Sequence, residues 1–351
     1  MPKAFKALRK GLTEMYTVPD IMKQATNIKL VSADGIFFDG TYFNKMYFLQ
    51  TASQNRVPFE GIFALLRKEN VRFQCRKEYP DGKNYLTLFC KGEIPDESIL
   101  TFFAAMEQKV SKQIFAAGLP LKLISVDTDT RLKMLHAMTM DERKPLEKNY
   151  LPGGMWLKDL RMPQINWAKS HDCFLHKGDF QKIFMICTIS AECESLYPSI
   201  EAIPDIRLIV SEFSAISDSL VIKHMESLYL DVNTVYAKLR KRNPDLYNAY
   251  VNGAKVDTYG YSFSGMLLLL SSPTKDMLRD NEYLLQQAAK SGKYQVISLY
   301  GSQRENFLSM LPTASFPLQT RVHPTDAAIE FFPYVSEGLR QPEREGESHG
   351  V

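Results

Sequence analysis

The sequence predicts an α+β fold built from two consecutive units with mixed or antiparallel sheets. Short apolar stretches bounded by glycine, proline and aspartate indicate strands, and longer stretches with an apolar residue every three to four positions indicate helices. In the second half these elements alternate as β-α-β, which supports the same class. We divide the chain into an N-terminal segment (1–27), a first α+β domain (28–150), a linker (151–170), a second α+β domain (171–334) and a disordered tail (335–351).

The first unit begins with strands and tight turns. Residues 28–49 read as two short strands, in which Asp34-Gly35 and Asp39-Gly40 supply turns because glycine tolerates a positive φ. A helix is predicted at about 57–68. We then expect a hairpin of VRFQC and NYLTLFC around Tyr79-Pro80-Asp81-Gly82, a helix from Pro95 to Gly118, the strand LKLISV, and a helix from about Thr128.

The second unit alternates more regularly. One predicted helix stands out, with Ser272 placed as its N-cap, Pro273 at its first position and Gly292 at its exit. We interpret the order as a ferredoxin-like split β-α-β unit with a long helical insertion, and we find no sequence repeat. The predicted strands are 180–189, 206–213, 261–270 and 294–300, and the predicted helices are 192–201, 219–242, 273–291 and 302–310.

The bulk composition is that of a soluble globular protein. Of 351 residues, 45% are hydrophobic and 24% are charged, and the net charge of +3 is too small to indicate a nucleic-acid or membrane binder by itself. The most apolar stretch, 266–270, is far shorter than the roughly 20 residues that a membrane span needs. Five scattered cysteines without a CxxC pair suit a reducing compartment. We therefore expect a cytoplasmic protein.

Nothing in the sequence supplies a phosphate-binding loop. The nearest approach, Ser291-Gly292-Lys293-Tyr294, lacks an upstream glycine at Ala288 and has a tyrosine where the magnesium ligand should be. We interpret Gly292 as a helix exit instead. We expect no cofactor and no catalytic residue.

Two further chemistries are weighed and set aside. A zinc site would need two ligand pairs at fixed spacing, whereas the sequence offers one irregular cluster, so no metal site is predicted. A hydrolase could be assembled on paper, but no GxSxG motif supports it. The residues concerned are His171, Cys173, His176, Cys187 and Cys193 for zinc, and Cys173 or Ser219 with His171 or His224 for the hydrolase.

A nucleic-acid interface is the alternative function. Tyr259-Gly260-Tyr261-Ser262-Phe263 loosely echoes the aromatic strand of RNA-recognition sheets, although Thr258 stands where that motif begins with a basic residue. A basic run closes the predicted long helix, where positive charge also suits the helix dipole. The candidate contacts to a single strand are Tyr259, Tyr261, Phe263, Arg240, Lys241 and Arg242.

The order of features near the C-terminus carries a family resemblance. A helix that ends in Phe-x-x-x-Leu-Pro is followed by an arginine and then by a short apolar segment that closes on proline and an aromatic residue. The residues are Phe307, Leu311, Pro312, Arg321, Pro333 and Tyr334. Over about 28–334 the chain resembles the region just ahead of the motor domain in the large conjugal-transfer ATPases of type IV secretion systems.

The resemblance implies an assembly and docking role. In that family a RecA-like motor with the P-loop follows this region, and hexamers dock on an inner-membrane channel complex. This chain stops where the motor would begin, so no catalytic residue is carried over and we expect no ATPase activity. The implied partners are other conjugation and secretion proteins, including the channel complex, together with further copies of the chain. The protein is expected at the inner face of the membrane through those partners.

Overall fold

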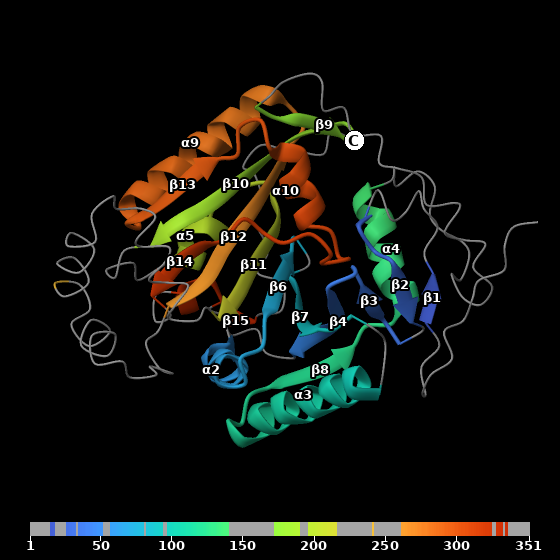
Figure 1. The fold of residues 1–351 in the computed structure, drawn as a ribbon. Coiled ribbons are helices and arrows are strands. Elements are labelled where there is room, and N and C mark those ends of the chain that lie inside the picture. The colour runs from blue at the N-terminus through green and yellow to red at the C-terminus, as the bar shows by residue number, and fades with distance from the viewer. Residues whose placement is uncertain are drawn as a thin grey trace, which may run out of the picture.

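The computed structural model confirms the α+β class (Figure 1). No described helix has both the length and the apolar character that a membrane crossing requires. The structure describes residues 15–17, 26–32, 34–51, 57–80, 82–93, 97–139, 172–189, 196–215, 241, 261–324, 328–332 and 334–335.

The elements of the first unit follow the expected order. Gly35 and Gly40 both have positive φ, as the predicted turns require. The hairpin, the two following helices and the strand between them are confirmed. The elements are β1 (Met15–Thr17), β2 (Leu30–Ser32), β3 (Ile36–Phe38), β4 (Tyr42–Thr51), β5 (Val57–Pro58), α2 (Glu60–Lys68), β6 (Phe73–Glu78), β7 (Lys83–Lys91), α3 (Glu97–Ala116), β8 (Leu121–Ser125) and α4 (Thr128–Thr139).

The second unit also keeps its predicted order, with two qualifications. The long helix expected at 219–242 lies outside the described residues except for Lys241, which is helical. The N-cap of the next helix is Thr274 rather than Ser272. The elements are β9 (Phe174–His176), β10 (Asp179–Ile189), α5 (Leu196–Glu201), β11 (Ile206–Ala215), β12 (Tyr261–Ser272), α9 (Lys275–Ser291), β13 (Tyr294–Ser298), α10 (Gln303–Ser309), β14 (Arg321–Pro324), η3 (Ile329–Phe331) and β15 (Tyr334–Val335).

The two units share one antiparallel sheet, whereas the sequence predicted separate sheets. Strand β6 of the first unit pairs with β11 of the second, with Cys75 directly opposite Ser211. The sheet runs β1-β2-β3-β4-β7-β6-β11-β12-β10-β13, and the remaining small sheet joins β15 to β5. The boundary expected at 151–170 lies outside the described residues.

Both units have the same strand order. In the first, the chain order β4-α2-β6-β7-α3-β8 gives the neighbours β8-β4-β7-β6. In the second, β10-α5-β11-β12-α9-β13 gives β13-β10-β12-β11. The preceding strand, β3 or β9, pairs with the same edge of β4 or β10 that β8 or β13 uses. The ferredoxin-like assignment of the second unit stays a prediction, because the segment between β11 and β12 is mostly undescribed.

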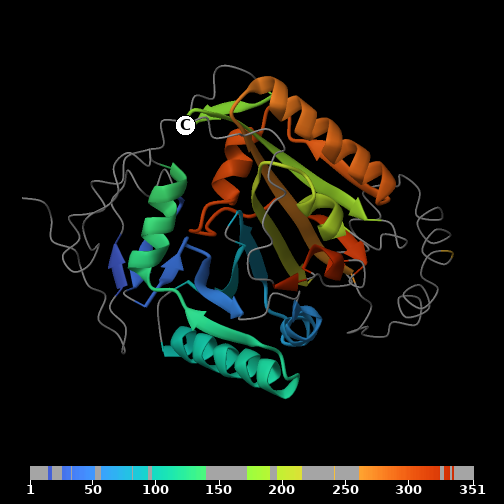
Figure 2. The ribbon, with the colours of Figure 1, turned by 180° about the vertical axis from the view of Figure 1, so that it is seen from behind.

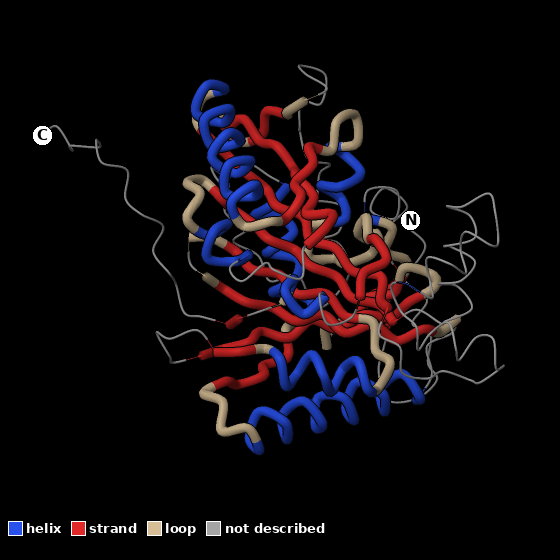
Figure 3. Tube along the Cα trace, turned by 90° about the vertical axis from the view of Figure 1, so that its left-hand side faces the viewer, coloured by secondary structure: helices blue, strands red, loops and turns tan. Residues whose placement is uncertain are grey.

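Helices cover both faces of this sheet (Figure 3). One core cluster contains the buried sides of α2, α3, α5 and α9, and it takes residues from both units, including Phe73 and Phe213. The other cluster contains α4 and α10 on the opposite face. The shared sheet and shared cores make the two units one body.

Candidate functional site

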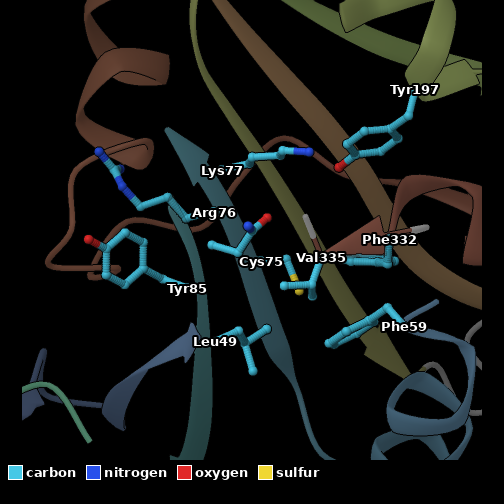
Figure 4. Close-up of a pocket in the computed structure, with 10 residues that line it drawn as sticks. Leu49, Phe59, Cys75, Arg76, Lys77, Tyr85, Tyr197, Phe332 and Val335 are labelled. Atoms are coloured by element: carbon cyan, nitrogen blue, oxygen red, sulfur yellow. The ribbon is translucent and has the colours of Figure 1, made fainter. Parts of the chain in front are cut away.

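A hollow lies at the junction of the two units, on the face that carries α2 and α5 (Figure 4). It is narrow, with room for about one water molecule. Strand β6 supplies its floor and α5 its upper wall. The lining residues are Leu49, Phe59, Cys75, Arg76, Lys77, Asn84, Tyr85, Tyr197, Phe332 and Val335.

Both cations that line this hollow are already engaged, and Arg76 forms a salt bridge of 2.6 Å with Glu78. Lys77 forms a salt bridge of 2.6 Å with Glu201 of α5, and the hydroxyl of Tyr79 donates to the same carboxylate oxygen at 2.7 Å. The Lys77 ammonium also lies 5.9 Å from the centre of the Tyr197 ring. Because Lys77 is 5% exposed, the pair links β6 to α5 away from solvent. Its arrangement suits a structural tie rather than capture of a phosphate.

The hollow does not provide an activated nucleophile. Burial raises the pKa of the Cys75 thiol well above its ordinary value, so the thiol stays protonated at neutral pH. Burial likewise raises the pKa of Tyr197, whose hydroxyl donates to the carbonyl oxygen of Phe331 at 3.2 Å. Cys75 and Tyr197 therefore behave as packing groups.

A second buried ionic group lies at the same junction. Glu212 of β11 accepts from Arg72 at 2.8–2.9 Å and from the backbone N–H of Leu318 at 3.3 Å. The Arg72 guanidinium packs against the rings of Tyr42 and Phe89, with its central carbon 4.8 and 4.3 Å from their centres. Burial raises the pKa of Glu212, although Arg72 opposes that shift. The group joins strands of both units.

Arg131 of α4 is the largest fully buried side chain among the described residues. Its guanidinium donates to the carbonyl oxygens of Pro312 at 2.8 Å, Gly35 at 2.8 Å and Thr313 at 3.1 Å, and to the side-chain oxygen of Asn44 at 2.7 Å. Burial lowers the pKa of this group. Because its acceptors come from both units, Arg131 fastens the segment after α10 to the first unit.

A more open groove lies beside α3 and encloses about 770 Å³, open solvent included. Lys45 and Glu107 face each other across it at 3.8 Å, and Asp34 and Asp127 lie at its rim. Apolar side chains of Ile36, Leu100 and Phe103 also line it, so the groove is of mixed character and lies wholly in the first unit.

The residues of the family resemblance serve mainly as structure. Phe307 and Leu311 are buried in the core beneath α10, and the carbonyl of Pro312 accepts from Arg131. Arg321 is exposed at the start of β14, opposite Ser264. Tyr334 pairs through its backbone with Pro58, and Pro333 lies outside the described residues.

The candidate nucleic-acid residues are described in part. Phe263 is half-buried in β12, between its partners Ser214 of β11 and Val322 of β14. The backbone of Tyr261 pairs with Pro324, and Lys241 is exposed. The remaining three, Tyr259, Arg240 and Arg242, lie outside the described residues. Nothing tests the interface, which stays a prediction.

The structure describes only some of the histidines and cysteines weighed for zinc or hydrolysis. Cys173 is buried, and His176 Nε2 lies 2.7 Å from the carbonyl oxygen of Met138. Cys187 is part of β10. In the described part of the chain no three His, Cys, Asp or Glu side chains are grouped to hold a metal ion. The others, His171, Cys193, Ser219 and His224, lie outside that part.

Sequence reasoning missed Arg131, Lys77 and Glu212. For Arg131 a signal existed, since it lies four residues before the buried Leu135 and three after the buried Thr128, on the inner face of α4. For Lys77 and Glu212 no local signal existed, because each charge is satisfied by a residue more than 100 positions away.

A scan against protein-family models finds no match for this chain, and a search of curated proteins finds none either.

Proposed function

We propose that this protein is an assembly and docking module of a conjugative type IV secretion machine. It links a separate motor to the secretion channel and to neighbouring subunits, at the inner face of the membrane, without hydrolysing ATP itself. The resemblance over about 28–334 is the reason for assigning the protein to a type IV secretion machine.

The observation that carries this proposal is the clasp between Arg131 and the Leu311–Thr313 segment. The Leu-Pro pair of the resemblance lies directly where the first unit holds the second, through the carbonyls of Pro312 and Thr313. A rigid two-unit body suits a part that transmits position between a motor and a channel. The engaged state of Lys77 and the protonated thiol of Cys75 support a non-catalytic role.

Co-purification with the products of neighbouring transfer genes tests the proposal. We expect the wild-type chain to capture at least one of them, and Arg321→Glu to reduce that capture because Arg321 is exposed beside β12. The matched control is Arg304→Glu, which reverses an exposed charge on α10. Capture of none of these proteins by the wild-type chain contradicts the proposal.

Two further measurements separate the alternatives. The pure chain should show no nucleotide turnover, and turnover that a point change abolishes would refute the docking role. In a fluorescence-anisotropy titration at low salt, binding of a single strand that weakens with salt and with Phe263→Ala would favour the nucleic-acid alternative. A titration in which the anisotropy does not change would remove the nucleic-acid alternative and favour the docking role.

A further inference from the structure

The groove beside α3 has an apolar wall and a charged rim. Figures 1 and 2 show α3 next to β8 at the outer border of the first unit. The volume of about 770 Å³, open solvent included, is in the range of small-molecule sites. The apolar wall consists of Ile36, Leu100, Phe103 and Ala104, and the polar lining consists of Asp34, Lys45, Glu107, Ser125 and Asp127.

A buried hydroxyl beside this groove lacks a partner. Tyr47 is fully buried, and its hydroxyl forms no hydrogen bond with the described part of the chain. Its side chain lies on the same face of β4 as that of Lys45, two positions earlier, and Tyr47 pairs directly with Ser125 of β8. Because Lys45 and Ser125 both line the groove, the phenol lies in its inner wall. Burial, together with the charge of Glu107, raises the pKa of Tyr47 well above its ordinary value, so the hydroxyl stays protonated and can donate.

The second unit has the same arrangement with its polar groups satisfied. Phe184 stands at the position of Tyr47, two residues after the paired lysine of its unit, so no hydroxyl is buried there. By strand register, Asp172 stands at the position of Gly35, and it gives Lys182 a second carboxylate at 2.5 Å. The first unit therefore lacks a carboxylate beside the lysine at which its buried hydroxyl lacks an acceptor.

The helices that cover the two lysines differ in the same direction. Glu107 of α3 and Glu282 of α9 are equivalent, because each pairs with the lysine of its unit. Three residues earlier, α3 has Ala104 where α9 has Arg279. The short side chain of Ala104 leaves the groove open on its helix side.

The charges of the groove limit the chemistry of its ligand. Three carboxylates, Asp34, Glu107 and Asp127, outnumber the single ammonium of Lys45. A simple anion would be repelled by this excess of negative charge. A ligand that brings a carboxylate to Lys45 therefore also needs a positive charge to complement the rim. The apolar wall favours a ligand that has an apolar side chain as well.

We infer that this groove binds a free amino acid with an apolar side chain. Its carboxylate accepts from Lys45 and from the Tyr47 hydroxyl, in the role that Asp172 has in the second unit. Its ammonium lies against Asp34 and Asp127, and its side chain packs on the apolar wall. This inference does not depend on the proposed docking role.

Isothermal titration calorimetry on the full chain tests the inference, with L-leucine, L-methionine and L-phenylalanine as probes. We expect at least one of them to bind. Its amide, which lacks the carboxylate, should bind about tenfold or more weakly, because Lys45 and Tyr47 lose their acceptor. The matching carboxylic acid without the ammonium should also bind about tenfold or more weakly, because nothing then offsets the charges of the rim.

Variants of the groove assign the contacts. Lys45→Met should weaken binding by about tenfold or more, and Tyr47→Phe by about fivefold. Asp127→Asn should weaken binding of the amino acid but not of the acid that lacks the ammonium. Asparagine keeps the cap that Asp127 provides to the backbone N–H of Thr130, so the start of α4 is preserved.

A matched control makes the outcome decisive. Lys122 is an exposed lysine of the same strand as Ser125, on the other face of the sheet, and Lys122→Met should leave binding unchanged. Thermal melts without ligand check that each variant folds. Binding of none of the three amino acids, an amide that binds as tightly as its parent, or equal weakening by Lys45→Met and Lys122→Met would overturn the inference. Capture of transfer proteins bears on the docking role alone.

Discussion

Each unit contains an equivalent lysine–glutamate pair between a strand and a helix, but the lysine is more deeply buried in the second unit. In the first, Lys45 follows Phe43-Asn44 on β4 and lies 3.8 Å from Glu107 of α3. In the second, Lys182 follows Phe180-Gln181 on β10 and lies 2.9 Å from Glu282 of α9. Each ammonium lies above the ring two residues later, at 5.5 and 5.3 Å. The Lys45 side chain is 15% exposed, whereas that of Lys182 is 4% exposed.

One residue accounts for the difference. Counted back from the paired residues Phe38 and Leu175, Gly35 stands in the first unit where Asp172 stands in the second. Asp172 supplies a second carboxylate to Lys182 at 2.5 Å. Gly35 cannot, since a Cβ there would lie 2.0 Å from the carbonyl oxygen of Val126. The shared strand register places the lysine and glutamate alike in both units. The residue at the position of Gly35 or Asp172 then determines whether the lysine gains a second carboxylate.

The largest expected effect comes from the buried hydrogen bonds of Arg131 to Pro312 and Thr313. Arg131 is the fourth residue of α4, the helix after β8, and Asn306 is the fourth residue of α10, the helix after the equivalent strand β13. Arg131→Ala should lower the free energy of unfolding by about 3–5 kcal/mol, because it leaves several buried carbonyls without donors. Asn306→Ala should cost about 1 kcal/mol, since Asn306 Nδ2 bonds to Ser302 of its own helix.

Urea denaturation of both variants measures these losses. Arg131→Lys is the second test, and it should recover little stability because an ammonium cannot reproduce the spread of guanidinium donors. Equal losses for Arg131→Ala and Asn306→Ala would mean that the hydrogen bonds of Arg131 contribute no more to stability than those of Asn306.

The two lysine corners should differ next. Lys182→Met should lower the free energy of unfolding by about 2 kcal/mol, because it leaves Asp172 and Glu282 facing each other. Lys45→Met should change it by less than about 1 kcal/mol, because its single pair is longer and partly solvated. The midpoints of urea unfolding, compared at equal m-values, give both numbers. A larger loss for Lys45→Met would reverse the comparison.

Much of the fold was predictable from local pattern, whereas its repetition was not. The hairpin 73–91 and the helix 97–116 follow directly from turn residues and apolar spacing. The junction between β6 and β11 joins residues about 140 positions apart, and no local pattern encodes it. The repeat escaped notice because the matching strands preserve residue character rather than identity, as LKLIS in β8 and YQVIS in β13 show.

Little of the candidate site was predictable from the sequence. The sequence singled out Phe307 and Leu311 through the family resemblance, and the structure buries both in the core. It could not locate the ion pairs Lys77–Glu201 and Arg72–Glu212, since a charged residue on a strand reads as solvent-exposed unless its distant partner is known. Tertiary pairing overrides that local expectation.

The stability of the junction between β6 and β11 should depend on pH through Glu212 of β11. One residue beyond the central pair Cys75 and Ser211, β6 carries Arg76 and β11 carries Glu212. Burial raises the pKa of Glu212 above its usual 4.5, so the folded state holds this proton more tightly than the unfolded chain. Its stabilising contribution is fully present below pH 4.5 and is lost as pH rises through the folded pKa.

Glu212→Gln should therefore flatten the dependence of unfolding free energy on pH. One group contributes a slope of at most about 1.4 kcal/mol per pH unit, so the difference between the two curves is bounded. Urea unfolding at intervals from pH 4 upward measures it. Parallel curves for the wild type and Glu212→Gln would show that Glu212 ionises alike in both states.

The smallest effect concerns the start of α9. Thr274 accepts a hydrogen bond from the backbone N–H of Met277 at 3.2 Å, whereas Ser272 donates to Asp205 at 2.7 Å inside the sheet. Thr274→Ala should therefore cost about 1 kcal/mol and speed hydrogen exchange at the Met277 amide. Ser272→Ala should leave that amide unchanged, because its hydroxyl serves β12. Faster exchange at Met277 in Ser272→Ala would return the cap to Ser272, and α9 would then begin as its sequence alone suggests.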